Sequence, residues 1–305
     1  MDAPELNVVT GAFSYSGKYI TRRLLDKGKR VRTLTGHPGR TNPFGERVSV
    51  AAYDFENPSE LEKSLRGATT LINTYWVRFS HGAMTFERAV ENTRILIAAA
   101  KRAGVRRIVH VSITNPSEES SLPYFRGKAL LERSVQESGL SYAVLRPAVI
   151  FGPEDILINN IAWFLWKFPV FGVPGRGDYG LQPIFVEDMA DLVVDAAERK
   201  DNYVLDAVGL EIFGFEELVR LIAQTIGRPA RIVHVRPTVA WLACWMAGLA
   251  VQDVVLTREE IQGLMANLLV SKGAPTGTMR LSEWLKKNAD SVGAHYASEL
   301  GRHFR

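Results

Sequence analysis

The order of segments in the first half of the chain constrains the fold more than any other feature. Runs of β-branched and apolar residues alternate with helical patterns from residue 6 to residue 146. Strands are predicted at Leu6–Thr10, Arg30–Thr35, Val48–Tyr53, Thr69–Thr74, Arg107–Ser112 and Tyr142–Arg146, and helices at Tyr15–Asp26, Met84–Arg102 and Leu122–Glu137. Strands that alternate with helices in this way form parallel sheets covered on both faces. The sequence therefore predicts an α/β fold built on a doubly wound parallel sheet.

The alternation loosens after Gly152. Aromatic residues stand among prolines and glycines over residues 153–182, and the chain after residue 209 is mostly helical. We expect residues 1–152 and 183–209 to form the sheet domain, and residues 153–182 and 210–305 to form a smaller, mostly helical substrate-binding cap. Within that cap the apolar run Val239–Val251 is too short to span a bilayer, so we expect a buried or pocket-lining helix.

Composition excludes several classes of function. The chain has 305 residues, and 37 lysines and arginines against 33 acidic residues give a net charge of +4, so no nucleic-acid partner is expected. The basic residues around Gly104 are expected to form a solvated edge. The six histidines show no metal-ligand spacing, so no metal site is predicted. A single cysteine, Cys244, and the absence of a visible secretory signal favour a reducing, cytoplasmic location.

The stretch VVTGAFSYSGKYI, residues 8–20, joins the first strand to the first helix through a glycine-framed turn. Backbone N–H groups and the positive end of a helix in this context favour binding of a dinucleotide pyrophosphate. Gly11 and Gly17 frame the turn, but Ser14 stands where a middle glycine is usual. The Ser14 side chain either crowds the phosphates or donates a hydrogen bond to them, and an ordinary corner that binds nothing remains an alternative.

Two further positions bear on which nucleotide would bind. An acidic residue after the second strand is typical of NAD sites, but none occurs here. Arg40 or His37 would instead meet a 2′-phosphate, which favours NADP(H) over NAD, unless Arg40 is only a solvated loop charge. Asp54, after the third strand, either accepts a hydrogen bond from the adenine amino group or serves as a cap or turn residue.

The stretch SLPYFRGKALLERS contains the second candidate site. Pro123 begins a helix, so Tyr124 and Lys128 fall four residues apart on one face. A cation beside a phenol lowers the phenol pKa and suits it for proton transfer. Ser112, or its rival Thr114, would hydrogen-bond a substrate oxygen, and a surface pair of Tyr124 and Lys128 is the alternative.

Together, the turn, Asp54, Ser112 and the Tyr-x-x-x-Lys pair resemble the short-chain dehydrogenase/reductase superfamily. The phrases LINTYW, ENTRILIAAAKRAGVRRIVHVS, LRPAVIFGP and PIFVEDMADLV agree with its atypical and extended branches, which include NAD-dependent epimerase/dehydratase-like, NmrA-like and complex I accessory-like proteins. The resemblance covers roughly residues 6–209 and implies a Rossmann-like NAD(P)-binding fold.

The resemblance also implies a set of site residues. The catalytic residues would be Tyr124, Lys128 and Ser112, with Lys128 also reaching the nicotinamide ribose. The residues that would contact the cofactor are Gly11, Ala12, Phe13, Ser14, Tyr15, Gly17, Arg40, Asp54, Phe55, Asn73, Thr74, Lys128 and Pro147.

Two functions follow from these observations. The first is an NAD(P)-dependent oxidoreductase or epimerase, in which proton transfer by Tyr124 and Lys128 is coupled to hydride transfer at a carbonyl or hydroxyl carbon of a small-molecule substrate. The second is a non-catalytic NAD(P)-binding protein that senses redox state or serves as an accessory subunit. Membrane contact through Val239–Val251 is the interpretation that the sequence favours least, and the oligomeric state is not predicted.

Overall fold

A computed structural model describes residues 5–303 of the chain. The chain divides into two compact units. The first, here called the sheet unit, runs to Pro147 and includes Val186–Asp206. The second, here called the helical unit, consists of Ala148–Phe185 and the residues from Ala207 onward.

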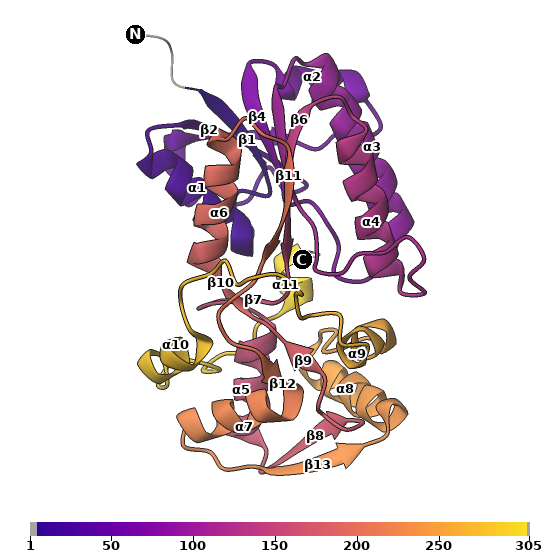
Figure 1. Cartoon of the computed structure of the whole chain (residues 1–305), viewed down its shortest axis with the longest axis vertical. Coiled ribbons are helices and arrows are strands. Elements are labelled where there is room, and N and C mark those ends of the chain that lie inside the picture. Colours follow the sequence, from indigo (N-terminus) through magenta and orange to yellow (C-terminus); the bar gives the residue numbers. More distant parts are fainter. Residues whose placement is uncertain (1–4, 304–305) are drawn as a thin grey trace. The chain divides into compact units, whose positions relative to one another are not determined.

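The sheet unit is built on a seven-stranded sheet in the order β11-β6-β5-β4-β1-β2-β3, which confirms the predicted α/β architecture (Figure 1). Neighbours among β1 to β6 pair in parallel. The strands are β1 (Leu6–Thr10), β2 (Arg30–Thr35), β3 (Val48–Ala52), β4 (Ala68–Asn73), β5 (Arg107–Val111), β6 (Ser141–Pro147) and β11 (Tyr203–Ala207). Because β4 follows β3 but lies beside β1, the chain changes direction across the sheet there. Ligands of such folds bind at the carboxyl ends of the strands on either side of this point.

Two groups of helices pack against the sheet. Helices α1 (Tyr15–Asp26) and α6 (Val186–Glu198) pack on each other, as do α2 (Pro58–Leu65) and α3 (Phe86–Arg102), and α3 and α4 (Pro123–Gln136). Figure 1 shows α1 and α6 on one side of the sheet and α3 and α4 on the other. Strands buried on both faces carry continuous apolar runs, and all five residues of β1 are buried. A short 3₁₀ helix, Gly45–Arg47, precedes β3.

The helical unit has its own core and three two-stranded sheets. The sheets pair β7 (Ile150–Phe151) with β10 (Ile184–Phe185), β9 (Gly180–Leu181) with β12 (Phe213–Gly214), and β8 (Val170–Pro174) with β13 (Arg231–Val235). The helices are α5 (Leu157–Lys167), α7 (Phe215–Thr225), α8 (Pro237–Val251), α9 (Arg258–Met265), α10 (Leu281–Lys287) and α11 (Glu299–His303). The core gathers Phe151, Leu165, Leu218 and Trp284 from four of these elements.

Helix α8 differs from its sequence prediction. It lines a pocket on one side, which agrees with the expectation of a pocket-lining helix. It is not a buried helix, because only Ala240 and Gly248 within it are buried while several large apolar side chains are exposed. Among residues 5–303, no helix is both long and apolar enough to cross a membrane.

Candidate functional site

The glycine turn begins where β1 ends. Gly11 has φ +68°, in the left-handed region that favours glycine. A Cβ added at Gly17 would lie 2.0 Å from the Gly11 carbonyl oxygen, so α1 approaches the turn more closely than any side chain at position 17 would allow. The turn is tied to β2, since the Gly11 N–H donates to the Leu34 carbonyl at 2.8 Å and the Ala12 N–H to the Thr33 hydroxyl at 3.0 Å.

Ser14 fits this turn without backbone strain. It is the N-cap of α1 with φ −75°, a conformation open to every residue, and its hydroxyl makes no capping bond. The Ser14 Oγ lies beside Gly11 and Gly17 instead, 3.3 and 2.9 Å from the positions that a Cβ would take there. No residue in the described part of the chain accepts a hydrogen bond from the Phe13 or Ser16 N–H. These free donors at the positive end of a helix fit a phosphate group.

Thr10 clamps the carboxyl ends of β1 and β4 together. Its hydroxyl accepts hydrogen bonds from the N–H groups of Thr74, at 2.7 Å, and Tyr75, at 3.0 Å. The Thr74 hydroxyl in turn donates to the Thr10 carbonyl. The segment after β4 is therefore held directly beside the glycine turn, where the strand order reverses.

A buried polar pair, Asn73 and His110, continues the same edge of the sheet to β5. The Asn73 side-chain nitrogen lies 3.0 Å from Nδ1 of His110, and both residues are fully buried. Burial lowers the pKa of His110 well below its ordinary value, and nearby Lys128 lowers it further. His110 is thus neutral, with Nδ1 accepting from Asn73 and the proton on Nε2, which has no partner among the described residues.

Tyr124 and Lys128 lie in the first two turns of α4, beneath an indole ring. The Trp76 ring meets the Tyr124 ring edge to face at 5.7 Å between centroids, and the Lys128 Nζ lies 4.8 Å from the Trp76 centroid. A Cβ at Gly127 would lie 2.6 Å from this indole. Helix α4 therefore packs closely against Trp76 at Gly127.

Lys128 is 3% exposed, and its Nζ donates to the carbonyl of Val111 at 2.9 Å. This bond fixes α4 to the carboxyl end of β5. Burial lowers the pKa of Lys128 to about 7, although Glu132 one turn further along α4 opposes that shift. The side chain can therefore change its protonation state near neutral pH.

Ser112 follows Val111 directly and is also buried. Its N–H donates to the Leu145 carbonyl of β6 at 2.7 Å, but its Oγ has no hydrogen-bond partner among the described residues. Thr114, the rival candidate, is buried and its N–H donates to the carbonyl of Pro147 at 2.9 Å. A buried, unpartnered hydroxyl is costly, and such a group fits hydrogen bonding to a bound molecule.

The remaining predicted contacts follow β2 and β3. Asp54 accepts from the Asn57 N–H at 2.9 Å, which is the turn role weighed above. The Phe55 ring packs on Tyr53 and Tyr75 at 5.1 and 5.4 Å. Arg40 is exposed and lies in a turn, in which its N–H donates to the His37 carbonyl. Arg40 thus lies on a loop beyond β2, apart from the buried residues at the ends of β4 and β5.

The sequence analysis did not identify Trp76 and His110, which contact the predicted site residues on α4 and β4. Trp76 and His110 are each one residue in an otherwise ordinary loop or strand, and no local pattern sets them apart. The glycine at position 127, inside a helix, was the one available signal for the indole, because glycine is unfavourable in a helix interior and there often marks a close neighbour. Among the described residues, no group of three or more His, Cys, Asp or Glu side chains could hold a metal ion.

The strand order and the glycine turn define the class of nucleotide-binding Rossmann domains. Within that class, residues 11–156 match the family described as NAD(P)H-binding. The chain therefore carries an NAD(P)-binding domain of the Rossmann type.

Three relatives extend over both units. NADH dehydrogenase (ubiquinone) 1 alpha subcomplex subunit 9, mitochondrial, of Rattus norvegicus is 24% identical and covers 88% of this chain and 73% of the relative. Photosystem II assembly factor Ycf39 of Cyanophora paradoxa is 29% identical over 75% of this chain and 71% of the relative. Ceramide reductase of Caulobacter vibrioides is 25% identical over 76% of this chain and 74% of the relative. Similar proteins thus include both a reductase and proteins named as a subunit or an assembly factor.

Solved structures show the same fold. NADPH-dependent quinone oxidoreductase QOR2 of Escherichia coli, crystallised with NADPH, has a TM-score of 0.72 at 19% identity and covers 93% of this chain and 98% of its own. Triphenylmethane reductase of Citrobacter sp. has a TM-score of 0.71 at 18% identity and covers 93% of this chain and 99% of its own. At these identities the likeness concerns the fold alone.

Proposed function

We propose that the chain is an NAD(P)H-dependent oxidoreductase, or an epimerase, that acts at a carbonyl or hydroxyl carbon of a small molecule. One observation carries the proposal. Lys128 binds the backbone at the carboxyl end of β5, directly beside the buried and unpartnered Ser112 hydroxyl, and Tyr124 lies on the same face of α4. This arrangement supports a site that combines a proton donor, a cation and a hydrogen-bond donor in an NAD(P)H-binding domain.

Each residue then has a role in carbonyl reduction. Tyr124 gives a proton to the carbonyl oxygen, and Ser112 hydrogen-bonds that oxygen. When protonated, Lys128 would supply positive charge on the same face of α4 as the phenol, and that charge would stabilise the phenolate formed when the proton leaves. When bound, NAD(P)H supplies the hydride.

The residues that would hold the nucleotide follow the turn and the strand ends. The free N–H groups of Phe13 and Ser16 would bind the pyrophosphate, with Gly11, Ala12, Tyr15 and Gly17 shaping the turn. Asp54 and Phe55 would contact the adenine, and Asn73, Thr74 and Pro147 the nicotinamide half. Arg40 would pair with a 2′-phosphate, and the lack of an acidic residue over Gly36–Arg40 supports NADP(H).

The Tyr124→Phe variant tests the mechanism. With a substrate found by screening carbonyl compounds, quinones and sugar nucleotides for NADPH oxidation, we expect turnover to fall by roughly 10²- to 10⁴-fold, because the general acid is lost. Cofactor affinity should stay within about twofold, since the hydroxyl is not needed for binding. Tyr203→Phe, a tyrosine on β11, serves as the matched control. Unchanged turnover in Tyr124→Phe would remove Tyr124 from the reaction.

A non-catalytic accessory protein is the second candidate. It is favoured by the Trp76 ring, which covers both Tyr124 and Lys128 in this structure, and by relatives named as a subunit and an assembly factor. Tight NAD(P)H binding with no oxidation across the whole substrate panel would support this candidate over the enzyme.

A further inference from the structure

Helix α8 is apolar on every side of its axis, yet it lies at the surface of the helical unit. Its sequence, PTVAWLACWMAGLAV, contains no charged residue. Leu242, Trp245, Met246 and Leu249 are between 46% and 65% exposed and follow one another at helical spacing. A surface helix normally turns a polar face to water, and a contiguous exposed apolar face marks a site of interaction.

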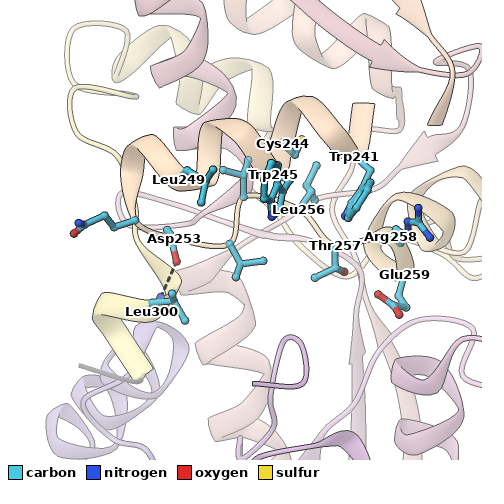
Figure 2. Close-up of a pocket in the computed structure, with 14 residues that line it drawn as sticks. Trp241, Cys244, Trp245, Leu249, Asp253, Leu256, Thr257, Arg258, Glu259 and Leu300 are labelled. Atoms are coloured by element: carbon cyan, nitrogen blue, oxygen red, sulfur yellow. Dashed lines mark hydrogen bonds between the residues drawn. The ribbon is translucent and has the colours of Figure 1, made fainter. Parts of the chain in front are cut away.

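The exposed face borders a groove of about 680 Å³. Figure 2 shows Trp241, Trp245 and Leu249 projecting from α8 toward the segment of residues 252–259, with Leu256 opposite them. The exposed Leu242 and Met246 form a ridge beside this groove. The surface thus offers both a ridge that can enter an apolar medium and a hollow that can receive a hydrocarbon chain.

The charge around α8 is asymmetric. Residues 218–252 contain four arginines and no acidic residue, although one of the four, Arg220, pairs with Glu216 just before this segment. Arg236 caps the start of α8 and is exposed, and the Arg258 guanidinium lies 4.3 Å from the centroid of the Trp241 ring. Neither arginine has an acidic partner within ion-pair distance in the described part of the chain. Glu259 is the exposed acid at the groove.

Asp253, the other acid that lines the groove, is buried and already engaged. Its two carboxylate oxygens accept from the N–H groups of Glu299 and Leu300 at the start of α11, and Figure 2 marks the bond to Leu300. It therefore fixes the far side of the groove and presents little charge to a partner. Arg258 at the groove and Arg236 at the start of α8 are the cations that this surface offers to anions.

We propose that α8 and its groove are a docking surface for a bilayer that contains anionic phospholipids, with α8 lying in the plane of the interface. The apolar ridge and Trp245 enter the boundary between headgroups and acyl chains, while Arg236 and Arg258 meet lipid phosphates. At 15 residues α8 is too short to span the bilayer. The lipid surface is favoured because the apolar ridge lies beside two arginines that have no acidic partner among the described residues, and an anionic bilayer supplies both a hydrocarbon layer and phosphates.

Flotation of the full chain with vesicles tests the proposal. We expect the chain to float with vesicles of phosphatidylcholine and phosphatidylglycerol at 3:1, to float much less with phosphatidylcholine alone, and to be released as salt is raised. Failure to float with the anionic vesicles would overturn the proposal, as would equal flotation with both kinds.

Variants locate the surface. Leu249→Glu should weaken binding to anionic vesicles at least roughly tenfold, because it replaces buried hydrocarbon with a charge. Arg236→Glu with Arg258→Glu should weaken it by roughly 25-fold or more, since each arginine near an anionic surface contributes about fivefold. Ile212→Glu is the control, because Ile212 is 55% exposed but lies outside α8 and its groove.

Two other outcomes would count against a lipid surface. If the Ile212 control weakened binding as much as Leu249→Glu, the attachment would not depend on α8. If the chain self-associated in solution by sedimentation velocity, lost that association in Leu249→Glu and ignored vesicles, α8 would be an interface between copies. Melting temperatures of the variants, compared with the parent chain, confirm that the changes at these exposed positions leave the fold intact.

Discussion

Single residues set the electrostatics of the candidate site. Lys128 is a buried amine that lies by the Trp76 ring, with the Val111 carbonyl as its hydrogen-bond acceptor. His110 is an imidazole held neutral by burial. The lowered pKa of each group limits the positive charge at this edge of the sheet at neutral pH. A lysine whose pKa lies near 7 is also the kind of group that proton-transfer sites employ.

Lys128 should make stability depend on pH. Its folded pKa of about 7 lies below the unfolded value of 10.5, so the unfolded chain binds the additional proton between these limits. The free energy of unfolding should therefore rise with pH across this window, relative to Lys128→Met, by about 1 kcal/mol per pH unit. Below pH 7 the difference should be constant.

Urea unfolding of the parent chain and of Lys128→Met at pH 7, 8 and 9 measures this difference. Lys63→Met is the control, since Lys63 is exposed and no such slope is expected there. A parallel pH dependence in the parent and in Lys128→Met would show that the amine is not desolvated.

At the scale of elements, an ion pair between a buried carboxylate and a partly exposed guanidinium fixes α4 on β6. Glu132 is 4% exposed and its carboxylate accepts from the Arg146 guanidinium at 2.9 Å. The pair raises the pKa of Arg146 and, through Glu132, opposes the lowering of the Lys128 pKa. The register of the helix that carries Tyr124 therefore depends on a contact two turns beyond it.

Breaking that pair should be costly. Glu132→Gln leaves the Arg146 guanidinium without its countercharge, and we expect a loss of about 2 kcal/mol in the free energy of unfolding, because the Arg146 side chain is 30% exposed and water partly screens its charge. Glu60→Gln removes the exposed pair with Lys63 and should cost under about 1 kcal/mol. Chemical denaturation of both variants checks the contrast, and equal losses would mean that burial does not govern the pair.

For the molecule as a whole, the sequence predicted the sheet unit well and the helical unit less well. β1, α1 and β2 have the predicted bounds because strand, turn and helix patterns are local there. The exposure of α8 was not predictable, since a helix that is apolar on all sides has no pattern that marks its outward face. The burial of Arg107 was not predictable either. The sequence placed it at a solvated edge, but it is buried and its guanidinium donates to the Ala196 carbonyl.

The candidate site, too, was predictable where local sequence patterns determine the structure and not where contacts between distant residues determine it. The turn from Gly11 to Gly17 and the helical pair Tyr124 and Lys128 follow from local spacing. Trp76 belongs to a loop, and its place over α4 depends on packing against residues far along the chain. Loops carry the least local information of any part of a fold, although they often carry the site.

Nucleotide binding should be visible in the stability of the whole chain. At 100 times its dissociation constant, NADPH should add about 2.7 kcal/mol to the apparent free energy of unfolding, which corresponds to a rise of several degrees in melting temperature. We expect a smaller rise with NADH at the same concentration. Ser14→Glu should abolish the shift by repelling the phosphates, while its ordinary φ leaves the turn intact. A shift that survived in Ser14→Glu would place the nucleotide elsewhere.

The missing side chain at Gly127 links two positions that are far apart in the sequence. Because the indole of Trp76 occupies the space that any other residue at 127 would need, the two positions cannot drift independently. A substitution of Gly127 by alanine or any larger residue therefore requires that Trp76 has already been replaced by a smaller residue. The order of those two events is thus dictated by volume, and alanine at 127 should be found only beside a reduced residue at 76.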